Sequence, residues 1–271
     1  MSITTTGPAT SQYSFDNAAR EGDEQLRLLA GILDEHSTGV LARTGVTAGW
    51  RCLDIGPGAG TVTHWLAGRV GPGGHVTSLD LDPQHIPAAG NVTVQQGDVR
   101  TTELPADHFD LIHARLLLLH LTDRDEVIRR LVATLKPGGL LVTSDWDTTR
   151  HDVLLHAPNE AATAAFGVFQ EALLGILESN GADLGWAHRA PLSLRAAGLV
   201  DIETEVHNRL WPGGTAANLL HVSNSYQLRD ALVARGVTPE QLDLVRAAML
   251  DPETMVYCYL TYTSIGRRPS R

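Results

Sequence analysis

Residues 51–60 read RCLDIGPGAG, and this stretch decides the fold class. Its first half has the apolar character of a buried strand at 51–55, and residues 61–69 after it have the pattern of a helix. Three glycines, Gly56, Gly58 and Gly60, alternate between the two elements. Because glycine has no Cβ atom, the chain can turn tightly there and approach a ligand closely at the helix N-terminus. The stretch therefore predicts a ligand-binding loop in an α/β protein.

The same alternation of strands and helices continues along the chain. Further strands are predicted at 75–79, 92–95, 109–113 and 140–144. Thr122 and Asp125 have the spacing of a capping box for the helix before the last of these strands, and the turn at 136–139 ends that helix because proline cannot continue it. Helices at 23–33 and 38–44 precede the first strand. This rhythm predicts a Rossmann-like parallel sheet with helices on both faces.

The rhythm breaks after residue 147. A long helix predicted at 159–178 has no strand behind it, so we interpret it as an insertion over the ligand-binding edge of the sheet. The remaining elements are a helix at 191–197, a strand at 200–206, helices at 215–235 and 239–249, and a last strand at 255–265.

The spacing of the glycines and the nearby acids indicate the kind of ligand. The loop reads G-x-G-x-G, whereas the loop that binds a dinucleotide pyrophosphate reads G-x-G-x-x-G. Asp54 precedes the first glycine by two residues, where a carboxylate repels a pyrophosphate and attracts an ammonium group. Asp80 ends the second strand, at the position where an acid about twenty residues after the loop accepts hydrogen bonds from ribose hydroxyls. Asp98 and Val99 follow the third strand, where a carboxylate and an apolar side chain suit an adenine ring. The pattern favours a nucleoside that carries an ammonium group and no phosphate.

Composition excludes several classes of partner. The formal net charge is -10 with scattered basic residues, which disfavours a nucleic-acid substrate and suits a small neutral or cationic one. The N-terminus lacks the basic start and apolar core of a signal peptide, and no apolar run approaches the ~20 residues of a membrane span. Cys52 and Cys258 both lie in predicted strands. We therefore expect a cytoplasmic protein without a disulfide, and no membrane partner.

Five motifs occur in order, at 53–60, 80, 97–98, 109–112 and 135–139. As a set they resemble class I S-adenosylmethionine-dependent methyltransferases over residues 50–145. The chain is also similar to actinomycete natural-product methyltransferases, which share an N-terminal segment like 13–20 and an insertion before the sixth strand. The resemblance implies a seven-stranded sheet with an antiparallel final strand, S-adenosylmethionine as cofactor, S-adenosylhomocysteine as product, and a small-molecule acceptor.

The resemblance also assigns roles to residues and segments. It implies that Asp54 and Gly56 lie near the methionyl group and that Gly58 and Gly60 belong to the cofactor loop. Asp80 and Leu81 are then expected at the ribose, and Asp98 and Val99 around adenine. His113 and Arg115 are expected at the methyl-transfer channel, and Tyr13 over the cofactor. We expect one domain over 1–271, with an N-terminal helical cap (12–48), a cofactor-binding core (49–146), a helical insertion over the substrate site (147–193) and a C-terminal part of the sheet (194–271).

Methyl transfer needs a base only where the acceptor must lose a proton. Histidine titrates near neutral pH, and His113 and His151 are the preferred candidates, ahead of His120, His156 and His188. Asp145 and Asp147 flank Trp146, but no third oxygen ligand has a helpful spacing, so we expect no metal site. Trp146 is expected to form a wall of the substrate pocket.

The residues leave several alternatives open. A nicotinamide-dependent reductase is disfavoured by the glycine spacing, by Asp54 and by the absence of a Tyr-x-x-x-Lys arrangement, since Lys136 is the one lysine and lies in a turn. A cofactor-binding homologue that serves as a cyclase or regulatory module is not excluded by the loop. A protein or RNA substrate is argued against mainly by charge. The acceptor atom, the acceptor scaffold and the choice between monomer and homodimer also stay open.

Overall fold

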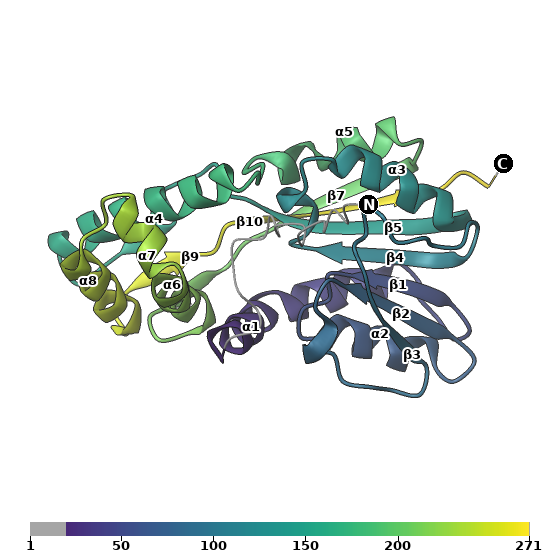
Figure 1. Cartoon of the computed structure of the whole chain (residues 1–271), viewed down its shortest axis with the longest axis horizontal. Helices are drawn as coiled ribbons and strands as arrows, with labels where there is room; N and C mark the ends of the chain where they lie inside the picture. Colours follow the sequence, from purple (N-terminus) through teal and green to yellow (C-terminus); the bar gives the residue numbers. More distant parts are fainter. Residues whose placement is uncertain (1–19, 271) are drawn as a thin grey trace, which may run out of the picture.

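The computed structural model describes residues 20–270, and its centre is a seven-stranded sheet (Figure 1). The strands are β1 (Arg51–Ile55), β2 (His75–Asp80), β3 (Val92–Gln96), β4 (Phe109–Arg115), β5 (Leu135–Asp147), β7 (Val200–His207) and β10 (Leu260–Arg267). Their order in the sheet is β3-β2-β1-β4-β5-β10-β7. Strands β1 to β5 are parallel, and β10 runs antiparallel to its neighbours β5 and β7. The predicted sheet, with its antiparallel final strand, is confirmed.

Helices cover both faces of this sheet. The C-terminal part of α1 (Arg20–Arg43) and α2 (Thr61–Val70) pack on one face, where Leu41, Leu66 and Cys52 belong to one buried cluster. On the other face lie α3 (Arg124–Thr134) and α5 (Trp186–Ala196), in a cluster that includes Leu53. Adjacent residues Cys52 and Leu53 fall in different clusters because side chains alternate across a strand.

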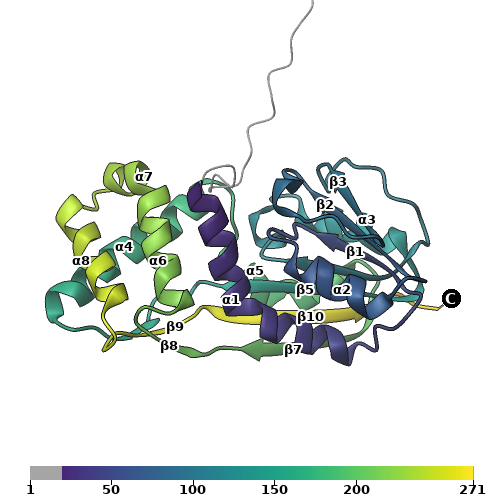
Figure 2. The same ribbon diagram turned by 90° about the horizontal axis from the view of Figure 1, so that it is seen from below.

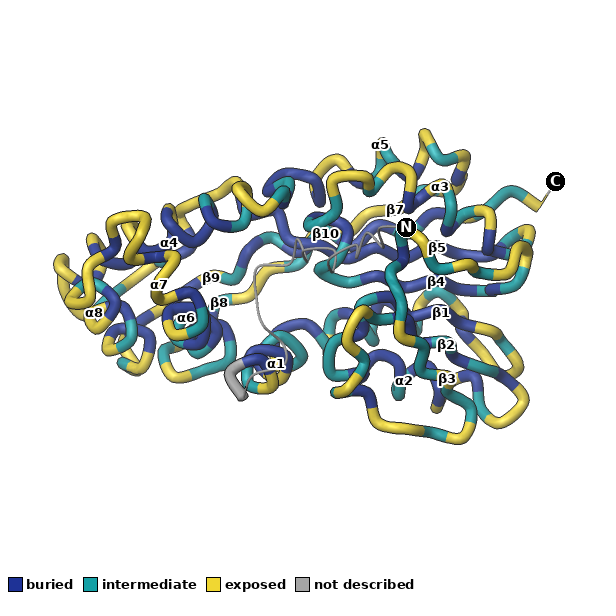
Figure 3. Tube along the Cα trace, viewed as in Figure 1, coloured by how far each residue is buried: buried dark blue, intermediate teal, exposed yellow. Residues whose placement is uncertain are grey.

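A second apolar core lies beyond the carboxyl ends of the parallel strands, and we call this part the helical lobe (Figures 1 and 2). It contains α4 (Glu160–Ser179), α6 (Ala216–Gln227), α7 (Arg229–Ala234), α8 (Pro239–Leu250) and a small antiparallel sheet of β6 (Leu154–His156), β9 (Met255–Tyr257) and β8 (Leu210–Pro212). Helix α1 runs between the lobe and the sheet and packs on α6 (Figure 2). Buried segments follow both the central strands and the inward sides of the lobe helices (Figure 3).

Two helix starts in the lobe follow from their capping residues. The Asn159 side chain accepts a hydrogen bond from the Ala162 amide at the start of α4. Thr238 and Gln241 form a reciprocal capping box at the start of α8, where Pro239 occupies the first helical position. These bonds satisfy backbone amides that have no partner inside the helix.

Three expectations about the elements were wrong. One helix, α1, replaces the two predicted before β1, since residues 34–37 continue the helix; in it Asp34 and Ser37 accept hydrogen bonds from Arg115. The predicted last strand divides into β9 and β10, which belong to different sheets. At α3 the capping residue is Asp123 and makes no side-chain cap, so the capping box predicted from Thr122 does not form.

The observed bounds of several other helices and strands also differ from the predicted ones. Helix α5 starts at Trp186 and carries Pro191 inside it, where the prediction began the helix. Strand β5 begins at Leu135, before the 136–139 turn, because Leu135 pairs with Phe109 and the register then shifts before Leu111 pairs with Leu140. The helix predicted at 215–235 divides between α6 and α7. Both cysteines are free, and Cys258 lies between β9 and β10.

Within residues 20–270, α4 is the one helix whose length and apolar composition would let it cross a membrane. Half of that apolar stretch is buried, and α4 packs against α7 and α8 in the core of the lobe.

Candidate active site

The glycine loop connects β1 to α2 at the carboxyl end of the sheet. Gly56, Gly58 and Gly60 have φ angles of 62°, 57° and 73°, a region that residues with a Cβ atom rarely adopt. A Cβ atom on Gly58 would lie 3.0 Å from Leu26 Cδ2 of α1, and one on Gly60 would lie 3.0 Å from Ile86 Cγ2. The loop therefore requires glycine both for its backbone conformation and for its close packing.

Asp80, the last residue of β2, brings a carboxylate next to this loop. Its Oδ1 atom accepts a hydrogen bond from the Asp82 amide at 2.9 Å. Burial raises the pKa of Asp80, while hydrogen bonds from the backbone amides of Asp82, Gly58 and Leu81 act in the opposite direction. The structure thus brings together Asp80 and Gly58, as two adjacent parallel strands ending at one edge require. The Leu81 side chain beside them is 52% exposed.

Asp98 and Val99 follow β3. The Asp98 carboxylate is already hydrogen-bonded to Arg100, and the Val99 side chain is already packed in an apolar cluster. Asp98 accepts hydrogen bonds from Arg100 Nε at 3.0 Å and from an Arg100 terminal nitrogen at 2.6 Å, and these bonds lower its pKa. Val99 is buried in the cluster that contains Leu79. An adenine amine would share the Asp98 carboxylate with Arg100, a contact that the sequence did not indicate. The adenine role of both residues stays a prediction.

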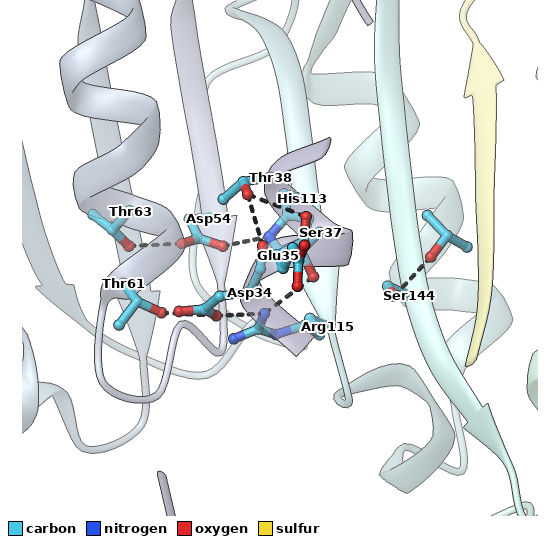
Figure 4. Close-up of polar contacts among 11 residues, drawn as sticks. Asp34, Glu35, Ser37, Thr38, Asp54, Thr61, Thr63, His113, Arg115 and Ser144 are labelled. Atoms are coloured by element: carbon cyan, nitrogen blue, oxygen red, sulfur yellow. Dashed lines mark hydrogen bonds and ion pairs between the residues drawn. The ribbon is translucent and has the colours of Figure 1, made fainter. Parts of the chain in front are cut away.

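Asp54 and His113 form a buried pair on the face of the sheet that α1 and α2 cover (Figure 4). They are register partners on β1 and β4, so their side chains point the same way. Asp54 Oδ1 lies 2.8 Å from His113 Nδ1, and Thr63 Oγ1 donates to Asp54 Oδ2 at 2.6 Å. Only 1% of Asp54 is exposed. A contact between Asp54 and an ammonium group would compete with this network, and it stays a prediction.

Arg115 ties α1 to the same edge of the sheet (Figure 4). It donates to Asp34 Oδ1 at 2.8 Å and to Ser37 Oγ at 3.0 Å, and Thr61 at the start of α2 donates to the same Asp34 oxygen at 3.1 Å. Asp34 and Ser37 were missed by sequence reasoning because their partners are 81 and 78 residues away in the chain. The available signal in the sequence was that these two side chains are polar on a largely apolar face of the helix, which indicates a polar partner on another element.

The other predicted residues lie apart from this cluster. His151 is exposed between β5 and β6, His156 is exposed in β6, and His188 is exposed with its Nδ1 atom 3.3 Å from the Tyr262 hydroxyl. His120 is half-buried near Arg124, and burial lowers its pKa to about 4. Tyr13 lies outside the described residues.

Asp145 and Asp147, at the end of β5, lie in different environments. Burial raises the pKa of Asp145 to about 7, whereas Asp147 accepts hydrogen bonds from the amide and hydroxyl of Thr149. Over residues 20–270, no three His, Cys, Asp or Glu side chains are grouped so that they could hold a metal ion. Trp146 between them donates to Thr261 Oγ1 at 3.0 Å, and its ring centroid lies 5.6 Å from that of Tyr259.

A family model described as a methyltransferase domain matches residues 53–143, which include the glycine loop, Asp80 and His113. These residues are a class I methyltransferase domain. The match confirms the predicted class and argues against the nicotinamide-dependent reductase. Methyltransferases of this class take their methyl group from S-adenosylmethionine, which was the predicted cofactor.

The sequence relatives match this chain over only part of the length of either protein. The chain is 30% identical over 150 residues to the ubiquinone/menaquinone biosynthesis C-methyltransferase UbiE of Pseudomonas paraeruginosa, which covers 52% of this chain and 57% of the relative. The UbiE protein of Shewanella sediminis is 31% identical over 120 residues, covering 41% and 48%. The chain thus spans about half the length of the curated relatives it matches.

Solved structures share the fold at low sequence identity. Phosphoethanolamine N-methyltransferase 2 of Haemonchus contortus, solved with S-adenosyl-L-methionine, has a TM-score of 0.59 at 17% identity, covering 97% of this chain and 61% of that one. The YcgJ protein of Bacillus subtilis has a TM-score of 0.54 at 17% identity, covering 87% and 99%. These likenesses show the fold of the sheet and its helices.

The residues at the carboxyl edge fit S-adenosylmethionine better than a dinucleotide. The glycine loop packs closely on Leu26 of α1, and the Gly58 amide donates toward the Asp80 carboxylate. Residues 53–60 contain no lysine or arginine to neutralise a pyrophosphate, and Asp54 and Asp80 both add negative charge nearby. A cationic nucleoside suits this distribution of charge.

Proposed function

We propose that this chain transfers a methyl group from S-adenosylmethionine to a small-molecule acceptor. The observation that carries the proposal is the placement of the Asp80 carboxylate beside the Gly58 amide, at the end of adjacent strands in a methyltransferase domain. A carboxylate at this position can accept hydrogen bonds from ribose hydroxyls, while the glycine loop admits the methionyl part.

The chain contributes mainly binding and alignment to such a reaction. When bound, S-adenosylmethionine supplies an electrophilic methyl group on a sulfonium. Displacement at that methyl group is accelerated by aligning the acceptor and by excluding water. Helix α1 is suited to the second task, since Leu26 packs on the loop and Asp34 bonds to both Arg115 and Thr61.

We propose His113 as the base for acceptors that must lose a proton. Asp54 bonds to its Nδ1 atom, which fixes the orientation of the ring and stabilises a positive charge on it. His151 is the second candidate, and its exposed position gives it no such fixed orientation. Replacement of His113 by Gln should lower kcat for such acceptors while S-adenosylhomocysteine still binds. If His151→Gln has that effect and His113→Gln does not, the roles are reversed.

The acceptor is proposed to be an intermediate of secondary metabolism, following the similarity to natural-product methyltransferases. The net charge of -10 supports a small molecule over a nucleic acid, and a cytoplasmic location is part of the same proposal. Relatives named as C-methyltransferases and a structural neighbour named as an N-methyltransferase leave O-, N- and C-methylation as separate outcomes of the test.

The test is incubation of the full chain with S-adenosylmethionine and a panel of acceptors, followed by mass spectrometry. Gain of one methyl group by an acceptor, with release of S-adenosylhomocysteine, supports the proposal. Tight binding of S-adenosylhomocysteine with rearranged but unmethylated products would support the cyclase alternative and overturn methyl transfer.

A further inference from the structure

Two histidine rings lie face to face where α1 packs against the large sheet. His36 is in the second half of α1, and His207 is the last residue of β7, the strand at the edge of that sheet (Figure 2). The ring centroids are 4.5 Å apart and the ring planes lie 15° from parallel. Only 8% of the His36 side chain is exposed. The stacked pair therefore joins α1 directly to the sheet.

The His36 ring is also bound to the neighbouring strands. Its Nε2 atom lies 3.0 Å from Thr263 Oγ1 on β10, and that hydroxyl lies 2.9 Å from Ser144 Oγ on β5. Ser144 is the register partner of Arg115 on β4. A chain of polar contacts thus runs from the stacked pair across β10 to the strand ends beside the glycine loop.

The stacked pair lies on the turn of α1 that is tied to this edge of the sheet. Asp34 and Ser37, which accept hydrogen bonds from Arg115, lie two residues before and one residue after His36. Leu26, nearer the start of the same helix, packs against the glycine loop. Because a helix couples the groups on its neighbouring turns, release of His36 from the sheet loosens the contacts of Asp34 and Ser37 as well.

The groups that face the pair can balance one positive charge but not two. Glu205 of β7 has its Oε1 atom 3.5 Å from His36 Nδ1, and its other carboxylate oxygen accepts a hydrogen bond from Arg43 of α1. Burial lowers the pKa of His36, the His207 ring lowers it further, Glu205 acts in the opposite direction, and Arg43 again lowers it. Protons on both rings would place two positive charges 4.5 Å apart, beside a carboxylate that is already paired.

We propose that His36 and His207 form a pH-sensitive switch, which holds α1 over the glycine loop while the rings are neutral and releases it when both are protonated. The other charged groups nearby, Glu35 of α1 and Arg209 after β7, pair with each other and add no net charge. Like charges at this separation repel each other, and more strongly where the site is partly buried.

The direction of the pH dependence follows from where the rings bind protons more readily. In the open form both rings are in water, where histidine has its ordinary pKa of about 6.5. Closing the helix lowers the pKa of His36, so protons are taken up when α1 opens. The contribution of the pair to the docking of α1 is fully present above about pH 7 and is lost as the pH falls below 6.5.

Native-state hydrogen exchange of the full chain, followed by mass spectrometry, tests the switch. After correction for the intrinsic pH dependence of exchange, the protection of an amide reports the ratio of closed to open helix. We expect protection over residues 30–43 to fall about fivefold between pH 7.5 and pH 5.0, the factor for two unit charges at this separation even under full solvent screening. The start of α1 is left out because the ion pair of His85 with Asp23 becomes stronger when His85 is protonated.

Two variants each remove one of the two charges. His207→Phe keeps a ring that stacks, and His36→Gln keeps a polar group that can reach Thr263. In both, protection over 30–43 should change by less than about twofold across the same pH range. His75→Phe is the matched control, because His75 begins β2, contacts Thr93 and lies at the opposite end of the strand from the glycine loop, and it should keep the wild-type response.

Three outcomes would overturn the inference. One is wild-type protection over 30–43 that does not change between pH 7.5 and pH 5.0. Another is a wild-type pH response in both His207→Phe and His36→Gln, because the charge on the stacked pair would then not be what opens the helix. The third is loss of the response in His75→Phe as well. No cofactor is added in this experiment, so failure of the proposed methyl transfer would leave its results unchanged.

Discussion

Replacement of Gly58 by alanine tests whether the loop conformation decides cofactor binding. Gly58 has φ of 57°, and an L-residue in this left-handed region costs about 1–2 kcal/mol. The added Cβ atom would meet Leu26 Cδ2 at 3.0 Å, which is the end of a flexible side chain and can move by a few tenths of an ångström. Backbone strain is therefore the larger effect. We expect the free energy of unfolding to fall by about 1–2 kcal/mol.

The same substitution should weaken cofactor binding, because any relaxation of the backbone moves the Gly58 amide away from Asp80. Denaturant titration measures the stability, and calorimetric titration with S-adenosylhomocysteine measures the affinity. Gly68→Ala in α2 is the matched control. Its Cβ atom would meet nothing within 4 Å and its φ is not positive, so it should stabilise the helix by about 0.5–1 kcal/mol. A Gly58→Ala protein as stable as Gly68→Ala, with unchanged affinity, would refute the reasoning.

Three further predictions concern acidic residues. Asp80→Ala should weaken S-adenosylhomocysteine binding by about 2 kcal/mol, roughly thirtyfold, as a charged hydrogen-bond acceptor is removed; an unchanged calorimetric affinity would take Asp80 out of the site. Asp54→Asn should lower the free energy of unfolding by about 1–3 kcal/mol, because Thr63 and His113 both bond to its carboxylate, and urea titration giving wild-type stability would contradict that network. Burial raises the pKa of Asp145 from 3.8 to about 7, so the folded protein binds its proton more tightly than the unfolded chain does. The contribution of Asp145 to the free energy of unfolding is fully present below pH 4 and is lost as the pH rises to about 7. Asp145→Asn should flatten this pH dependence in urea titrations between pH 4 and 8.

The order of elements around the glycine loop was readable from local patterns. Strand β1 has the predicted bounds, and the predicted bounds of β2, β3 and α2 differ from the observed ones by one residue. Apolar periodicity and glycine spacing are properties of neighbouring residues, and a parallel sheet aligns strands whose carboxyl ends must share one edge. The adjacency of Gly58 and Asp80 follows from that topology alone.

Contacts between distant segments were not readable in this way. Residues 34–37 fell between two predicted helices, whereas α1 continues through them and Asp34 and Ser37 bond to Arg115 on another element. The run at 255–265 looked like one strand because its apolar residues do not show that β9 joins the small sheet and β10 the large one.

By itself, the sequence determined the class of the protein: strand and helix order, the glycine loop, and an acid at the next strand end define the methyltransferase domain at 53–143. Only the tertiary structure decided what each polar side chain contacts. It turned the Asp54 carboxylate toward Thr63 and His113, engaged Asp98 with Arg100, and stacked His36 of α1 on His207 of β7. The physical reason is that burial and hydrogen bonding depend on which elements pack together, and side chains far apart in the chain carry no local mark of that packing.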